Sequence, residues 1–136
     1  MRSLSEPDRL PSDVELCAVI WSHLDAHPDC RPSQTGIARA LGIEPRRLRR
    51  AWHCAGRTPV RTMITRACLL YALWLIYNHH CKAVAAVRVA GFRSYWNANR
   101  QFKRYTGYTF GQCRDTLPLG LDIRSFLAKL NALHSP

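Results

Sequence analysis

The feature that most limits how this chain can fold is a pattern that occurs twice. Residues 37–43 (IARALGI) are matched by residues 86–92 (AVRVAGF), and the tetrapeptide that begins at Gly56 (GRTP) is matched by the one that begins at Gly107 (GYTF). Each copy reads as a short helix, a glycine turn and a basic second helix, with a compact residue four positions before the first glycine that lets two helices approach closely. The sequence therefore predicts an all-α fold with two tandem helix-turn-helix lobes.

Turn signals and helical periodicity divide the chain into five segments. In order, they are a flexible amino-terminal arm (1–12), the first lobe (13–57), a linker helix (58–78), the second lobe (79–116), and a linker with a carboxy-terminal amphipathic helix (117–136). The first lobe opens with an amphipathic helix whose apolar stripe is Val14, Cys17, Ala18, Trp21 and Leu24. Ser33 then caps a short helix, and Pro45 is a first-turn residue of a third.

The linker helix is predicted to be a long, buried rod. Thr58 is expected to cap it, with Pro59 at its first helical position, and the pattern continues to Tyr77. Such a helix would span ~28 Å, of the order of one turn of DNA at ~34 Å. The unbroken apolar run over 67–77 is well short of the ~20 residues that cross a bilayer, so we expect no membrane partner.

Positive charge is confined to one part of the chain. The net charge is +11, yet residues 1–44 carry four arginines against seven acids, and residues 115–136 are neutral. Residues 45–114 carry twelve arginines, two lysines and no acid, which gives +14. A surface that serves solubility mixes both signs, so this segment indicates a polyanionic partner.

Two predicted helices carry much of this charge. The helix over 45–55 has four arginines with no acid between them, and phosphates would relieve the repulsion among them. The helix over 94–105 begins at a Ser94 cap and is expected to turn Phe102 and Tyr105 inward. Its outer face consists of Trp96, Asn97, Arg100, Lys103 and Arg104. Helices decorated in this way suit the major groove of DNA.

The sequence shows no pattern typical of an enzyme or a metal site. Six cysteines lack C-x-x-C pairing and zinc-ligand spacing, and the adjacent His79, His80 and Cys81 would splay apart at a helix end. No nucleophile–base pair, paired carboxylates or phosphate loop is evident. We therefore expect no catalytic residues, no metal and no cofactor. The amino terminus lacks the apolar region of a signal peptide, which favours a reducing cytoplasm.

The most specific motif lies in the second lobe. It reads Gly91-Phe92, then Asn97-x-Asn99-Arg100-Gln101-Phe102-Lys103-Arg104, then Gly107 and Arg114. Together with the rest of residues 13–114, this motif resembles the DNA-binding domain of the AraC/XylS family of bacterial transcription regulators. The resemblance implies a seven-helix, two-lobed domain whose third and sixth helices enter the major groove. The chain departs from the family at Ala98, where an aromatic residue or Leu is usual, and at Phe110, where proline is typical.

The resemblance also implies which residues meet DNA. Base contacts would come from Arg46, Arg49 and Arg50 in the first lobe, and from Tyr95, Trp96, Asn97 and Arg100 in the second. Phosphate contacts are expected from Arg57, Arg61, Lys103, Arg104 and the Ser94 end of the second basic helix. An alternative for Trp96 is a packing wedge between the lobes.

We expect a sequence-specific regulator of the small stand-alone type that binds double-stranded DNA and activates transcription by touching RNA polymerase. It would act in the bacterial cytoplasm at the nucleoid and could bind as a monomer, its oligomeric state being open. Two alternatives remain: a sequence-indifferent nucleic-acid binder, RNA included, and a protein-interaction antagonist of a longer regulator. The antagonist would use the apolar seam within residues 123–133, which could instead dock on the chain's own domain.

Overall fold

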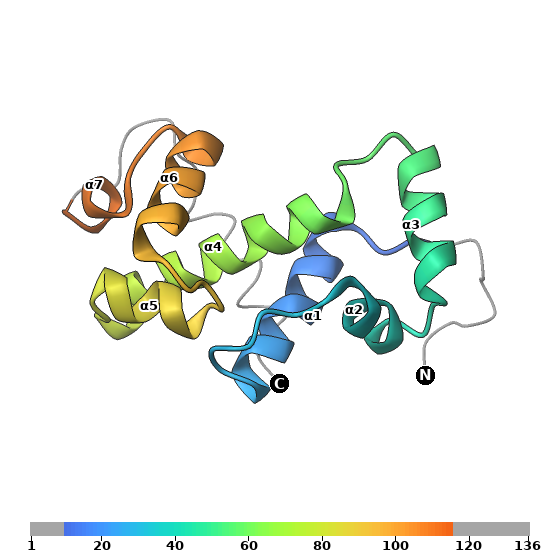
Figure 1. Cartoon of the computed structure of the whole chain (residues 1–136), viewed down its shortest axis with the longest axis horizontal. Helices are drawn as coiled ribbons and strands as arrows, with labels where there is room; N and C mark the ends of the chain where they lie inside the picture. The colour runs from blue at the N-terminus through green and yellow to red at the C-terminus, as the bar shows by residue number, and fades with distance from the viewer. Residues whose placement is uncertain (1–9, 116–136) are drawn as a thin grey trace.

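The computed structural model describes residues 10–115 (Figure 1). Within that range all regular secondary structure is α-helical, which confirms the expected all-α class. The helices are α1 (Asp13–Ala26), α2 (Gln34–Ala40), α3 (Pro45–Cys54), α4 (Val60–His79), α5 (Ala83–Val89), α6 (Tyr95–Thr106) and α7 (Phe110–Asp115). The helix predicted within 117–136 lies outside the described residues, as does most of the predicted amino-terminal arm.

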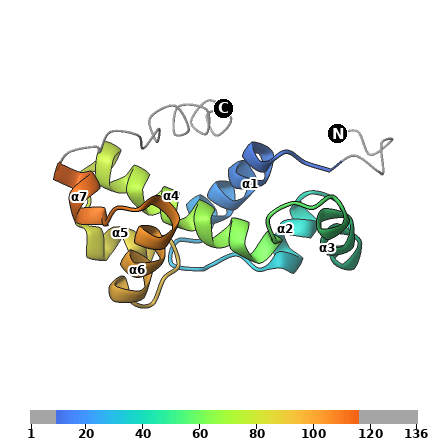
Figure 2. The ribbon, with the colours of Figure 1, turned by 90° about the horizontal axis from the view of Figure 1, so that it is seen from above.

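The long helix α4 is the centre of the molecule. Figures 1 and 2 place α2 and α3 at one end of α4, and α5, α6 and α7 at the other, with α1 beside it. The 20 residues of α4 span ~30 Å at 1.5 Å per residue. Because α4 separates the two groups of helices, its length sets how far apart α3 and α6 lie.

The start of α4 differs from the prediction by one position. Pro59 is the N-cap in place of Thr58, and no side chain caps the helix. The Thr58 carbonyl instead accepts a hydrogen bond from Trp52 Nε1 at 2.5 Å. Thr58 therefore belongs to the connection that holds the end of α3.

By length and composition alone, α4 would be long and apolar enough to cross a membrane. The 20-residue helix is much longer than the continuous apolar run that the sequence shows. Twelve of its residues are buried against the neighbouring helices. Burial inside the protein therefore accounts for its apolar composition.

The repeat predicted from the sequence appears as two matching turns. Gly42 (φ 74°) and Gly91 (φ 93°) both adopt the left-handed conformation that favours glycine. In each turn the amide after the glycine donates to the carbonyl four residues before the glycine, at 2.9 and 3.0 Å. The same bonds thus close α2 and α5. We call α2–α3 the first pair and α5–α6 the second pair.

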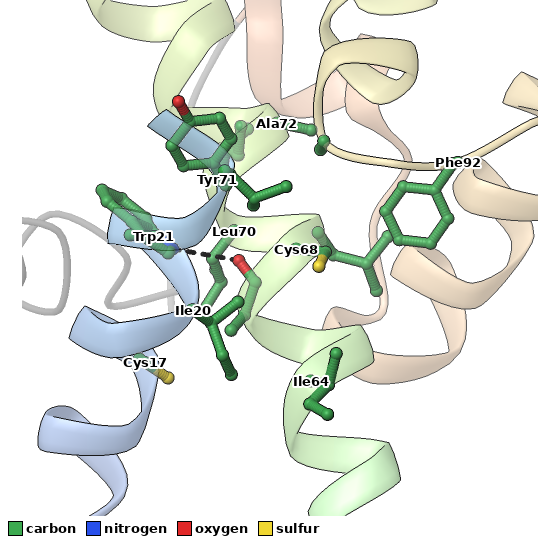
Figure 3. Packing of buried hydrophobic residues seen from close by; sticks show 14 of the residues in the cluster. Cys17, Ile20, Trp21, Ile64, Cys68, Leu70, Tyr71, Ala72 and Phe92 are labelled. Carbon is green, nitrogen blue, oxygen red and sulfur yellow. Dashed lines mark hydrogen bonds between the residues drawn. The ribbon is translucent and has the colours of Figure 1, made fainter. Parts of the chain in front are cut away.

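The core between α1 and α4 contains polar contacts that fix the register of the two helices (Figure 3). Trp21 Nε1 donates to the Ala67 carbonyl at 3.0 Å, and the Tyr71 hydroxyl donates to Asp25 at 2.6 Å. The rings of Trp21 and Tyr71 meet edge to face, with centroids 5.2 Å apart. These contacts hold α1 along α4.

The buried face of α1 is rotated from the predicted stripe. Leu16 and Ile20, which the stripe omitted, are fully buried, whereas Val14 and Ala18 are only half-buried. Most residues from 14 to 21 are apolar, so helical spacing alone could not choose among them. The contacts with α4 make the choice.

Candidate nucleic-acid interface

Helix α3 exposes its arginines because two large apolar residues hold it to the core. Glu44 caps the helix by accepting a hydrogen bond from Arg47 N at 2.9 Å, and Pro45 occupies the first turn. Leu48 and Trp52 are buried. The residues predicted to contact bases are all exposed, namely Arg46, Arg49 and Arg50. Within residues 10–115 no carboxylate pairs with any of these three.

Helix α6 is anchored in the same way. The Ser94 hydroxyl caps it by accepting a hydrogen bond from Asn97 N at 3.2 Å. Ala98 and Phe102 are fully buried, and Phe102 stacks on Phe110 with ring centroids 4.2 Å apart. The opposite face is exposed and consists of Trp96, Asn97, Arg100, Lys103 and Arg104. The structure therefore presents the outer face that the sequence predicted.

The other aromatic residues of α6 depart from the expectations. Tyr105 is 38% exposed, so it is not buried with Phe102 as expected, and the Arg66 guanidinium lies 4.6 Å from its ring centroid. Tyr95 is half-buried with its ring 6.5 Å from that of Phe110, which leaves only part of it for a base contact. Trp96 is 71% exposed, so the alternative that made it a wedge between the lobes is wrong.

Asn97 and Arg100 form a pair on the exposed face of α6. Arg100 Nη2 donates to Asn97 Oδ1 at 3.2 Å across one turn of the helix. An asparagine that reads adenine uses both its amide oxygen and its amide nitrogen. One of the two lone pairs of the Asn97 oxygen already accepts from Arg100, so this geometry favours Asn97 as a support for the Arg100 guanidinium, which suits guanine.

The contacts of Arg57 do not suit its predicted role as a phosphate contact. Its guanidinium pairs with Asp13 at 2.7 Å, donates to the Pro11 carbonyl at 2.8 Å, and lies 3.6 Å from the Trp52 ring centroid. These contacts tie the segment after α3 to the start of α1. No local pattern in the sequence indicates this role, because Asp13 lies 44 positions away along the chain.

A groove of about 530 Å³ lies where α4 begins, beside α3. Its lining includes Arg31, Arg49 and Arg61, which come from three different segments, and contains no Asp or Glu. Arg61, a predicted phosphate contact, is exposed there. Arg31 was missed by the sequence reasoning because it lies in the connection between α1 and α2, outside the two basic helices.

Asn99, which received no role from the sequence, joins α6 to α7. Its Oδ1 accepts a hydrogen bond from Phe110 N at 2.9 Å. A proline at position 110 would have no N–H to donate. Phe110, at a position where the family that the sequence resembles typically has proline, was therefore the available signal that an acceptor was needed nearby.

The cysteines and histidines form no cluster that could hold a metal within residues 10–115. Burial raises the pKa of Cys17 and Cys68 to about 12, and that of Cys113 to about 11. These thiols stay protonated at neutral pH and pack as small apolar side chains. Packing in the core accounts for these three of the six cysteines, whereas Cys30 and Cys54 are exposed.

The comparisons with known proteins bear on the fold. No protein-family model matches the chain, and no curated protein sequence matches it. Among solved structures, the chain is similar to the crystal structure of a protein described as a DNA-binding transcriptional dual regulator from Escherichia coli K-12. The match has a TM-score of 0.61, 17% sequence identity, and covers 85% of this chain and 96% of that chain. The two chains share a fold.

Proposed function

We propose that this protein is a sequence-specific regulator of transcription that binds double-stranded DNA. The observation that carries the proposal is a pair of exposed basic helices, α3 and α6, held at opposite ends of α4 and running in the same sense (Figure 1). Neither helix contains an acid. The protein from Escherichia coli with the same fold is described as a DNA-binding transcriptional regulator, which adds support.

The spacing of the two helices suits one face of a duplex. The ~30 Å length of α4 is close to the ~34 Å that separates successive major-groove segments on one side of B-DNA. One chain would then read two half-sites about ten base pairs apart without forming a dimer. Monomer binding follows from this geometry as part of the proposal.

The exposed side chains divide into two roles. Base contacts come from Arg46, Arg49 and Arg50 on α3, and from Trp96 and Arg100 on α6. Asn97 holds the Arg100 guanidinium in place, and the exposed part of Tyr95 supplies a further base contact. Phosphate contacts come from Arg61, Lys103, Arg104 and the amino-terminal end of α6 at Ser94. Arg57 is left out of the second set because Asp13 and Pro11 engage its guanidinium.

We place the protein with the DNA-binding domains of the AraC/XylS family, as an activator that touches RNA polymerase. The motif from Gly91 to Gly107 supports this assignment, since the resemblance implies seven helices with the third and sixth exposed for DNA. The bacterial cytoplasm, at the nucleoid, is the corresponding location.

A competition titration tests the proposed function. The full chain first selects a duplex from a random-sequence library, and random duplex and structured RNA then compete for the complex. We expect the selected duplex to bind about 10³-fold or more tightly than random duplex. Equal competition by all three would contradict the proposal and support a sequence-indifferent nucleic-acid binder.

A matched pair of variants separates base reading from charge. Arg46→Ala removes a cation from α3, and Arg39→Ala removes one from the exposed surface of α2. We expect Arg46→Ala to reduce the preference for the selected duplex, and Arg39→Ala to leave that preference unchanged.

A further inference from the structure

The segment between α1 and α2 connects the two ends of the molecule. It leads into the first pair, since Ser33 is the N-cap of α2. Its contacts, however, reach the second pair: Asp29 N donates to the Val89 carbonyl at 2.9 Å, at the end of α5. The two pairs are therefore joined by this segment as well as by α4.

Arg31 is the centre of this second connection. A Cβ atom at Gly91 would lie 2.9 Å from Arg31 Cα, so the backbone of the segment is seated directly on the turn of the second pair. The Arg31 guanidinium donates to the hydroxyl of Thr65 on α4 and lies 5.2 Å from the ring centroid of Phe92. Arg31 thus touches α4 and the second pair while its own segment leads into the first.

Helix α4 and the segment between α1 and α2 together restrict the orientation of the second pair more than α4 alone would. Packing on α4 sets the distance between α3 and α6, but a rotation of the second pair about the axis of α4 would change which face of DNA α6 meets. In B-DNA one base pair advances the groove by about 35°. A protein that accepts a single half-site spacing must therefore resist a rotation of this size. The contacts of Asp29 with Val89, and of Arg31 with Gly91 and Phe92, attach the second pair to a segment other than α4, so they oppose this rotation.

We propose that Arg31 determines the half-site spacing that this protein accepts, by locking the orientation of the second pair relative to the first. This inference rests on the proposed function. In this role Arg31 is a positioning residue that acts through Thr65, Phe92 and Gly91. It differs from a phosphate contact, which would change affinity for every duplex alike.

Selection from a random duplex library tests the proposal with the full chain, using the native protein and the Arg31→Ala variant. We expect the native protein to recover two motifs at one spacing. Arg31→Ala should recover the same two motifs at several spacings. An insertion of one base pair between the motifs should weaken native binding by about tenfold or more, and binding by the variant by about threefold or less.

Two further variants make the result decisive. Thr65→Val removes the hydroxyl that accepts the Arg31 hydrogen bond, so it should also recover the two motifs at several spacings. It tests the same claim if Arg31→Ala does not fold. Arg39→Ala removes the same charge from the same part of the chain and should keep the single spacing.

The failures of the two proposals look different. If the native protein selects no paired motifs, the proposed two-site reading fails, and this inference fails with it. If the native protein selects one spacing and both Arg31→Ala and Thr65→Val keep it, DNA reading stands and the role of Arg31 is overturned. A uniform loss of affinity with unchanged spacing would make Arg31 a phosphate contact.

Discussion

At the scale of single residues, the proposed reading of a base by α6 depends on two side chains. Asn97 and Arg100 lie on the exposed face, and the hydrogen bond between them orients the Arg100 guanidinium. Helical spacing predicted that both residues face outward. It could not predict the bond between them, which under the proposed function makes Asn97 a support for the Arg100 guanidinium.

The pair gives a prediction at the residue scale. We expect Arg100→Ala to weaken binding to the selected duplex by about 1–3 kcal/mol and to remove discrimination at one base pair. Asn97→Ala should reduce discrimination at the same base pair, and it should cause little further loss of affinity when Arg100 is already alanine. Asn97→Asp should keep the preference because it keeps an acceptor for Arg100. Affinities for duplexes that differ by one base pair measure this. A shift of preference at a different base pair in Asn97→Ala would show that Asn97 reads a base itself.

At the scale of helices, the sequence predicted most of what is observed where the signal is local. The glycine turns, the Ser33 and Ser94 caps, and the exposed arginines of α3 depend on residues within a few positions of one another. The buried face of α1 and the role of Arg57 depend on partners in distant segments. Those two features could therefore be seen only in the folded structure.

Two aromatic residues on opposite faces of α6 allow stability and binding to be separated. Phe102 is fully buried and stacked on Phe110, so Phe102→Ala should lower the free energy of unfolding by about 3–5 kcal/mol. Trp96 is mostly exposed, so Trp96→Ala should change stability by less than about 0.5 kcal/mol and yet weaken binding to the selected duplex. Chemical denaturation and binding titrations measure the two effects. Equal destabilisation by both substitutions would contradict this arrangement of α6.

At the scale of the whole molecule, the contact between Arg31 and Gly91 joins segments that are far apart in the sequence. Gly91 and Gly107 have nearly the same left-handed conformation, with φ of 93° and 90°. A Cβ at Gly107 would meet nothing within 4 Å, whereas one at Gly91 would strike Arg31. A side chain at either glycine would therefore suffer the same backbone strain. Only a side chain at Gly91 would also disturb the contact with Arg31 that links the two ends of the molecule.

This difference predicts unequal effects on stability. Gly107→Ala should cost about 1–2 kcal/mol from the left-handed conformation alone. Gly91→Ala should cost a further 1–3 kcal/mol or so, because the segment at Arg31 must move away. Thermal or chemical unfolding measures both variants. Equal losses would mean that the segment between α1 and α2 does not rest on the second pair as described.

The most direct test of the account is a hydroxyl-radical footprint of the full chain on the duplex that it selects. Two basic helices at opposite ends of a helix ~30 Å long, and running in the same sense, should bind successive major-groove segments. We predict two protected regions about ten base pairs apart on one face of the duplex, at a protein concentration where one chain is bound. A single protected region, or uniform protection along the duplex, would contradict the claim that one chain reads two half-sites.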